Sequence, residues 1–163
     1  MPLAQSLVKA EQFGAAECIA RRLVKTEPSS ADAHYLLGYI LSRRGKANES
    51  LAEYTSGARF RRPGSSELAV VALDYVLLKD YTDARKWMTQ AIAGDQSNPL
   101  YWYYLGRIDY NLNTFDEARA AFEKVLVLEP GNFITLASRW KVLDSRKEPY
   151  RSTSRLSMWR KTI

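Results

Sequence analysis

Apolar residues recur along this chain with the spacing of one face of an amphipathic helix. Over residues 31–44, the i, i+3, i+4 and i+7 positions are held by His34, Leu37, Gly38 and Leu41. This pattern predicts a helix, and Gly45 directly after it favours a helix end. The pattern resumes over residues 47–59, so the two stretches together predict a pair of helices joined by a short turn.

The predicted pair of helices recurs with a period of 34 residues. Four sets of positions keep this period: an aliphatic set (Leu3, Leu37, Val71, Leu105), a small set (Gly38, Ala72, Gly106), a second small set (Ala16, Ser50, Ala84, Ala118) and a mostly aromatic set (Phe13, Ala47, Tyr81, Phe115). The joints between successive units carry Pro28, Pro63, Pro99 and Pro130. A helical hairpin of this length cannot bury its own apolar face, so we predict that the hairpins stack in an all-α fold.

The best preserved unit lies between Pro99 and Asn132. Its residues Trp102, Leu105, Gly106, Ala118, Phe122 and Pro130 resemble the pattern of the tetratricopeptide repeat. The match is weaker over residues 65–98, and Asp109 stands where the family favours a tyrosine. The resemblance implies a right-handed α-α superhelix that ends in a C-terminal capping helix.

We expect a repeat domain over residues 1–146. Its units are expected at about 1–30, 31–64, 65–98 and 99–132, followed by a terminal helix at 133–146. The chain begins inside its first helix, which leaves open a preceding segment lost by truncation or processing. Residues 147–163 are expected to form a basic tail or linker.

In stacked hairpins of this kind, the first helix of each pair lines a concave face. The candidate peptide-binding residues on this face are Tyr35, Tyr39, Tyr103, Arg107, Tyr110 and, on the terminal helix, Lys141. Tyrosine offers a large contact area at low entropic cost and a hydroxyl for a peptide backbone. The two cations would attract an acidic side chain or backbone carbonyls. The sequence therefore predicts a non-catalytic scaffold or adaptor that binds a peptide segment of a protein partner in the concave groove.

Two other uses of these tyrosines remain open. They could cover edges of the core. They could also belong to a self-associating assembly module, a homo-oligomer in which the tail or the incomplete first repeat packs on a neighbouring chain.

The formal net charge of +6 is concentrated at the C-terminal end. Residues 139–163 hold eight basic and two acidic side chains, whereas residues 1–138 are balanced. Basic residues interleaved with Tyr150 and Trp159 are compatible with contact to nucleic acid, to an anionic membrane or to an acidic protein. We prefer the simpler interpretation, a linker or a solvated terminus.

The counts of reactive residues argue against an enzyme. Cys18 is the only cysteine and His34 the only histidine, which excludes an internal disulfide and removes most zinc and Ser-His-Asp chemistry. His34 takes the place of Trp102 in the repeat and is expected to pack between helices. Cys18 is expected to be a small, buried or half-buried filler. No stretch approaches the ~18 apolar residues of a membrane-spanning helix. We therefore expect a cytoplasmic, non-catalytic protein without cofactor, metal or small-molecule substrate.

Overall fold

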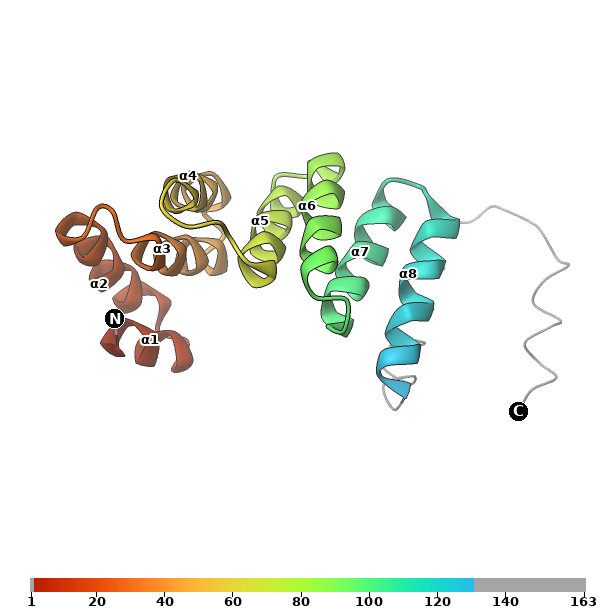
Figure 1. The fold of residues 1–163 in the computed structure, drawn as a ribbon, viewed down its shortest axis with the longest axis horizontal. Coiled ribbons are helices and arrows are strands. Elements are labelled where there is room, and N and C mark those ends of the chain that lie inside the picture. Colours follow the sequence, from red (N-terminus) through yellow and green to blue (C-terminus); the bar gives the residue numbers. More distant parts are fainter. Residues whose placement is uncertain (1, 131–163) are drawn as a thin grey trace, which may run out of the picture. The chain divides into compact units, whose positions relative to one another are not determined.

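The computed structural model describes residues 2–130, which form eight α-helices and no strand. The helices are α1 (Pro2–Lys9), α2 (Phe13–Thr26), α3 (Ala31–Arg43), α4 (Ala47–Ala58), α5 (Ser65–Leu77), α6 (Tyr81–Gly94), α7 (Pro99–Asn111) and α8 (Phe115–Leu128). They make four consecutive hairpins within one compact unit, Met1–Leu128 (Figure 1). The all-α helical-repeat superhelix expected from the sequence is confirmed.

The helix bounds follow local signals in the sequence. The two stretches predicted at 31–44 and 47–59 are observed as α3 and α4. Ser30 caps α3, because its hydroxyl accepts a hydrogen bond from the Ala33 N–H at 3.3 Å. Gly45 follows α3 with a φ of 74°, a conformation that favours glycine and lets the chain reverse into α4.

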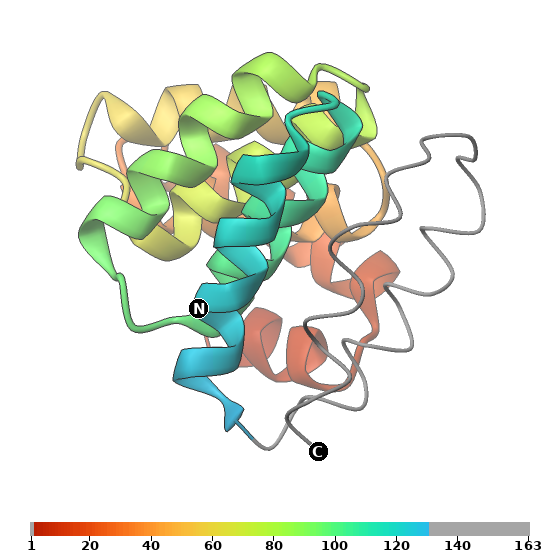
Figure 2. The same ribbon diagram turned by 90° about the vertical axis from the view of Figure 1, so that its right-hand side faces the viewer.

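Small residues bring the two helices of a hairpin together. The backbone of Gly106 on α7 lies so close to α8 that a Cβ atom there would be 2.7 Å from the Phe122 ring. At Gly38 on α3, the same atom would be 2.9 Å from the Tyr54 ring on α4. Real Cβ atoms essentially never approach a neighbour this closely. Glycine at these positions therefore permits the side-by-side, antiparallel packing visible for α7 and α8 in Figure 2.

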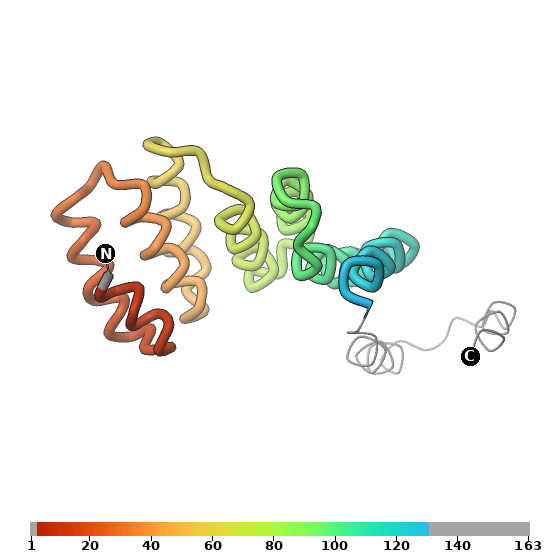
Figure 3. Tube along the Cα trace, turned by 60° about the horizontal axis from the view of Figure 1, so that its bottom comes forward, coloured from red at the N-terminus to blue at the C-terminus, as the bar shows by residue number. Residues whose placement is uncertain are grey.

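The core continues from each hairpin to the next, as stacking predicts. The first cluster joins α2 to α3 through Ala16, Ala20, Leu37, Ile40 and Leu41. The second joins α3, α4 and α5 through Ala31, Tyr35, Tyr54 and Val71. The third joins α5, α6 and α7 around Met88 and Ile108. Figure 3 shows the corresponding succession of helices from α1 to α8.

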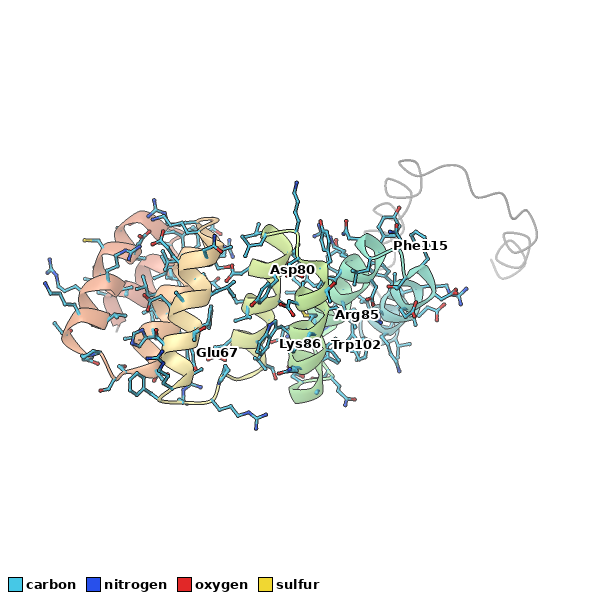
Figure 4. The ribbon with its side chains drawn as sticks, turned by 90° about the horizontal axis from the view of Figure 1, so that it is seen from above. Glu67, Asp80, Arg85, Lys86, Trp102 and Phe115 are labelled. Carbon is cyan, nitrogen blue, oxygen red and sulfur yellow. The ribbon has the colours of Figure 1, made fainter. Side chains whose placement is uncertain are left out.

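Asp109, which stands where the family favours a tyrosine, forms an ion pair between two hairpins. Its side chain is buried on α7, and its Oδ1 lies 2.9 Å from the Arg85 Nε on α6. Figure 4 shows Arg85 on the side of α6 that faces α7. Burial raises the pKa of Asp109, and the charge of Arg85 counteracts this in part. The pair thus joins two hairpins where the family favours a tyrosine.

His34 is a packing residue, as predicted. It is buried on α3, with Nδ1 2.7 Å from Glu53 Oε2 on α4 and Nε2 3.0 Å from the Pro28 carbonyl oxygen. The prediction for Cys18 is wrong, because its side chain is exposed on the outer side of α2 rather than used as filler. The predicted terminal helix at 133–146 and the tail at 147–163 lie outside the described residues.

Candidate binding groove

The described residues enclose a groove of about 340 Å³ along the first helices of three successive hairpins. Its lining residues are Gln5 from α1, Asp32, Tyr35, Leu36 and Tyr39 from α3, Tyr54 from α4, Arg61 from the α4–α5 connection, and Ser66, Glu67 and Val70 from α5. Most of this lining comes from α1, α3 and α5, the helices expected to form the concave face. A volume of this size suits a few side chains of a peptide.

Tyr35 forms the floor of the groove. It is only 5% exposed, and its ring stacks on that of Tyr54 with the ring centres 5.7 Å apart. It can lie flat against α4 because the neighbouring residue there is Gly57, where a Cβ would be 2.6 Å from the Tyr35 ring. Its hydroxyl donates to the Arg61 carbonyl oxygen. Tyr35 therefore both packs the core and lines the groove.

Tyr39 is the more accessible tyrosine of the groove. It lies one helical turn after Tyr35 on α3 and is half-buried. Its hydroxyl accepts a long hydrogen bond of 3.4 Å from the Arg43 Nη1. The guanidinium of Arg43 itself lies 5.1 Å from the centre of the Phe13 ring, so it is directed toward α2. The face of Tyr39 can therefore contact a ligand without disturbing the core.

Arg61 forms one edge of the groove, and the sequence analysis did not identify it. Its guanidinium lies 4.7 Å from the centre of the Tyr35 ring, a cation–π contact. Its Nη2 is 3.0 Å from Asp32 Oδ1 and 3.1 Å from Glu67 Oε1. It thus joins the start of α3 to the start of α5, where Figure 4 labels Glu67.

Glu67 is held in place by several donors. Its Oε2 accepts hydrogen bonds of 3.0 Å from the Gly64 N–H and from the Ser66 hydroxyl. Burial alone would raise the pKa of Glu67, but these hydrogen bonds and the Arg61 guanidinium lower it below the usual value. Glu67 is therefore ionised, and both of its oxygens already accept hydrogen bonds. Its carboxylate holds the Arg61 side chain and the first turn of α5 in place.

Three other predicted site residues lie on α7 and do not line the groove. The half-buried Tyr103 packs edge-on against Phe122 with ring centres 6.0 Å apart, and the Arg107 guanidinium carbon lies 5.8 Å from the Tyr103 ring centre. Tyr110 packs edge-on against Phe115 at 5.5 Å. Arg107 is exposed and borders a second, much smaller pocket of about 40 Å³ between α5, α6 and α7. Lys141 lies outside the described residues.

Residues 2–130 contain neither a metal-binding cluster nor a membrane-spanning helix. This part of the chain holds no cluster of three or more histidine, cysteine, aspartate or glutamate side chains able to bind a metal ion. None of its helices has the length and apolar character needed to cross a membrane.

Solved structures with the same arrangement of helices exist at low sequence identity. A crystal structure of MamA superposes with a TM-score of 0.72 at 19% identity, over 88% of this chain and 86% of that chain. YrrB, a TPR protein with an unusual peptide-binding site, gives a TM-score of 0.70 at 18% identity, over 80% of this chain and 68% of that chain. PilF of Pseudomonas aeruginosa gives a TM-score of 0.69 at 18% identity, over 92% of this chain and 75% of that chain. No curated protein sequence matches the chain.

Sequence models of one family match both ends of the described hairpin array. Models of the tetratricopeptide repeat match residues 1–66 and residues 99–132, which together make more than half of the chain. The first range covers the hairpins that line the groove, and the second is the unit in which Gly106 packs against Phe122. With these matches and the fold in agreement, the chain belongs to the tetratricopeptide repeat family.

Proposed function

We propose that this chain is a non-catalytic interaction scaffold that binds an extended segment of a protein partner in the groove along α1, α3 and α5. The observation that carries the proposal is the groove itself, which is lined by three tyrosines and two aliphatic residues. Tyrosines of this kind supply large contact areas with little loss of side-chain entropy. The family and the fold support a protein partner in general. YrrB, a TPR protein of similar fold, has a peptide-binding site.

The groove is formed before any ligand arrives. Tyr35 is locked by Tyr54 and by the Arg61 carbonyl, and Arg61 is locked by Asp32 and Glu67. A site that needs little ordering on binding keeps more of its contact energy as affinity. Tyr103, Arg107 and Tyr110 on α7 would extend the same surface, with Lys141 as a further contact.

The test compares one residue of α3 with one exposed apolar residue of α8. Proteins captured by the full chain would be identified by mass spectrometry, and their segments would be measured as labelled peptides by fluorescence anisotropy. We expect Tyr39→Ala to weaken binding about tenfold, as for a contact near the centre of an interface. Val127→Ala, which shortens a 74% exposed side chain on α8 outside the groove, should leave the affinity unchanged.

Two results would overturn the proposal. One is that no segment of a captured protein binds as a peptide. The other is that Tyr39→Ala and Val127→Ala have equal effects on affinity. Thermal melting of both variants shows whether a loss of binding reflects unfolding, and Tyr39 is suited to this comparison because it is half-buried rather than part of the core.

The second candidate function is self-assembly through the basic tail. It is favoured by the sequence, because residues 139–163 carry the whole net charge of +6, while the groove presents two carboxylates. Size-exclusion chromatography with light scattering on the full chain and on a version that ends at Arg146 tests it. A dimer that dissociates when the tail is removed would support self-assembly, and monomers in both cases would exclude it.

A further inference from the structure

We infer that the groove selects a partner segment with an arginine or lysine side chain, and that Asp32 is the carboxylate that receives it. This inference rests on the proposed function, because it names the chemistry of the peptide that the groove would bind. It concerns a foreign segment, and it differs from the expectation that cations on this face attract an acidic side chain.

The charges in the lining of the groove sum to a negative value. Three of its side chains are charged, namely Asp32, Arg61 and Glu67. The guanidinium of Arg61 is in contact with both carboxylates, so its charge is already compensated. One negative charge remains uncompensated, and in a partly enclosed site it favours a cationic ligand group.

Asp32 and Glu67 differ in how much of each carboxylate is available. The side chain of Glu67 is 21% exposed, and both of its oxygens accept hydrogen bonds. The side chain of Asp32 is 68% exposed, and its contact with Arg61 uses Oδ1. Within residues 2–130, Oδ2 of Asp32 has no hydrogen-bond donor. Of the two lining carboxylates, Asp32 is therefore the one with a free oxygen that faces solvent.

The surroundings of Asp32 suit the whole of a long cationic side chain. Leu36 lies one turn further along α3, and Val70 lies opposite on α5. The methylene groups of arginine or lysine can pack on these aliphatic residues while the charged end reaches Asp32. The face of Tyr39 lies in the same groove and adds contact area for the residues next to the cation.

Arg43 is a second cation near the groove, and it disfavours a ligand cation at its own end of α3. Arg43 donates to the Tyr39 hydroxyl, and it belongs to the last turn of α3, whereas Asp32 belongs to the first turn. Asp32 and Arg43 are therefore separated by roughly 16 Å along the axis of α3, at 1.5 Å per residue. The ligand cation is therefore expected at the start of α3, next to Asp32 and away from Arg43.

The experiment uses arrays of nonapeptides with randomised flanks and a central arginine, alanine or glutamate, probed with the full chain. We expect arginine-centred peptides to bind about fivefold more tightly than alanine-centred ones, the effect of one partly exposed ion pair. Asp32→Asn should bring this ratio close to one, and Asp32→Lys should shift the preference to glutamate. Asp116→Asn is the matched control, since Asp116 is also in the first turn of a helix and ion-paired to an arginine, Arg119.

The possible failures can be told apart. If peptides bind but show no preference for arginine, or if Asp32→Asn keeps the preference, this inference is wrong while the proposed function stands. If no peptide of any charge binds, the proposed function itself is wrong.

A further variant replaces Arg151, Arg155, Arg160 and Lys161 by glutamine. Much tighter peptide binding by that variant would show that the chain's own tail occupies the groove, and would overturn the assignment to a foreign segment. Equal binding supports the assignment.

Discussion

Asp74 on α5 occupies the same repeat position as Ile108 on α7, and both side chains are completely or almost completely buried. On α3 the equivalent residue is Ile40, also buried. Neither Asp74 oxygen accepts a hydrogen bond of ordinary geometry from the described residues. The hydroxyls of Ser42 and Ser50 lower its pKa in part, but Ser50 donates to the Gly38 carbonyl. The interface between the second and third hairpins thus contains a carboxyl where the second and fourth units have an alkyl group.

We expect Asp74→Ile to stabilise the protein. An uncompensated buried carboxylate is costly, and isoleucine is the residue that the same position accepts on α3 and α7. The free energy of unfolding at pH 7 should rise by about 2–3 kcal/mol, the cost implied by the raised pKa of Asp74. Guanidinium titration measures this change. The reciprocal substitution Ile108→Asp should destabilise by at least about 3 kcal/mol, and a neutral result for both would show that this position tolerates charge.

We expect the titration of Asp74 to contribute to the pH dependence of the free energy of unfolding. Burial raises its pKa from the usual 3.8 to about 6, so the folded state binds this proton more tightly than the unfolded state does. Between about pH 4 and pH 6 its contribution must therefore make the protein less stable as the pH rises, with no further change above that range. We expect the difference in unfolding free energy between the wild type and Asp74→Asn to change over this interval. A difference that is constant with pH would contradict the burial of an ionisable group.

The helices could be predicted closely because their signals are local. The apolar period of α3 and the glycine after it define a hairpin without reference to the rest of the chain. The period also aligns Asp74 with Ile40 and Ile108, so the burial of Asp74 could have been predicted from the sequence. Cys18 was misjudged because neighbouring positions of one helix face opposite environments, and a small residue fits either.

The groove was predicted only in part, because its edge depends on contacts between distant residues. Tyr35 and Tyr39 follow from the repeat position, and both line the groove. Arg61 pairs with Asp32 29 residues away, which no period reveals. The sequence does contain one signal, the basic residues within 59–62 that follow α4. Helix α4 has 12 residues, whereas the second helices of the other hairpins, α2, α6 and α8, have 14. The longer connection that results carries Arg61 over Tyr35.

Glu17 on α2 should stabilise the first two hairpins through three cations. Burial alone would raise its pKa, but hydrogen bonds from Lys46, Arg21 and Arg44 lower it to about 2. A lowered carboxyl pKa gives stability that is present above the usual pKa of about 4.5 and is lost as the pH falls toward about 2. Because the cations are 35–46% exposed, we expect Glu17→Gln to cost only about 1–2 kcal/mol at pH 7.

The control for Glu17 is another ion-paired glutamate that is open to solvent. Glu123 on α8 is 56% exposed and lies 3.7 Å from Arg119. Glu123→Gln should change the unfolding free energy by less than about 0.5 kcal/mol, since exposed pairs contribute little. If the two substitutions had equal effects in urea titrations, the cluster around Glu17 would be no stronger than an ordinary surface pair.

Gly106 and Gly14 provide the sharpest test of hairpin packing, since the same substitution should have opposite effects at the two positions. Alanine at Gly106 would place its Cβ 2.7 Å from the ring of Phe122, which is buried. We expect Gly106→Ala to destabilise by about 2 kcal/mol or more, as overpacking does. At Gly14 on α2 a Cβ meets nothing within 4 Å, so Gly14→Ala should stabilise by about 0.5–1 kcal/mol through helix propensity. Thermal melting of both variants measures this. Stabilisation by both would mean that α7 and α8 are not in close contact at Gly106, and that helix propensity alone governs both sites.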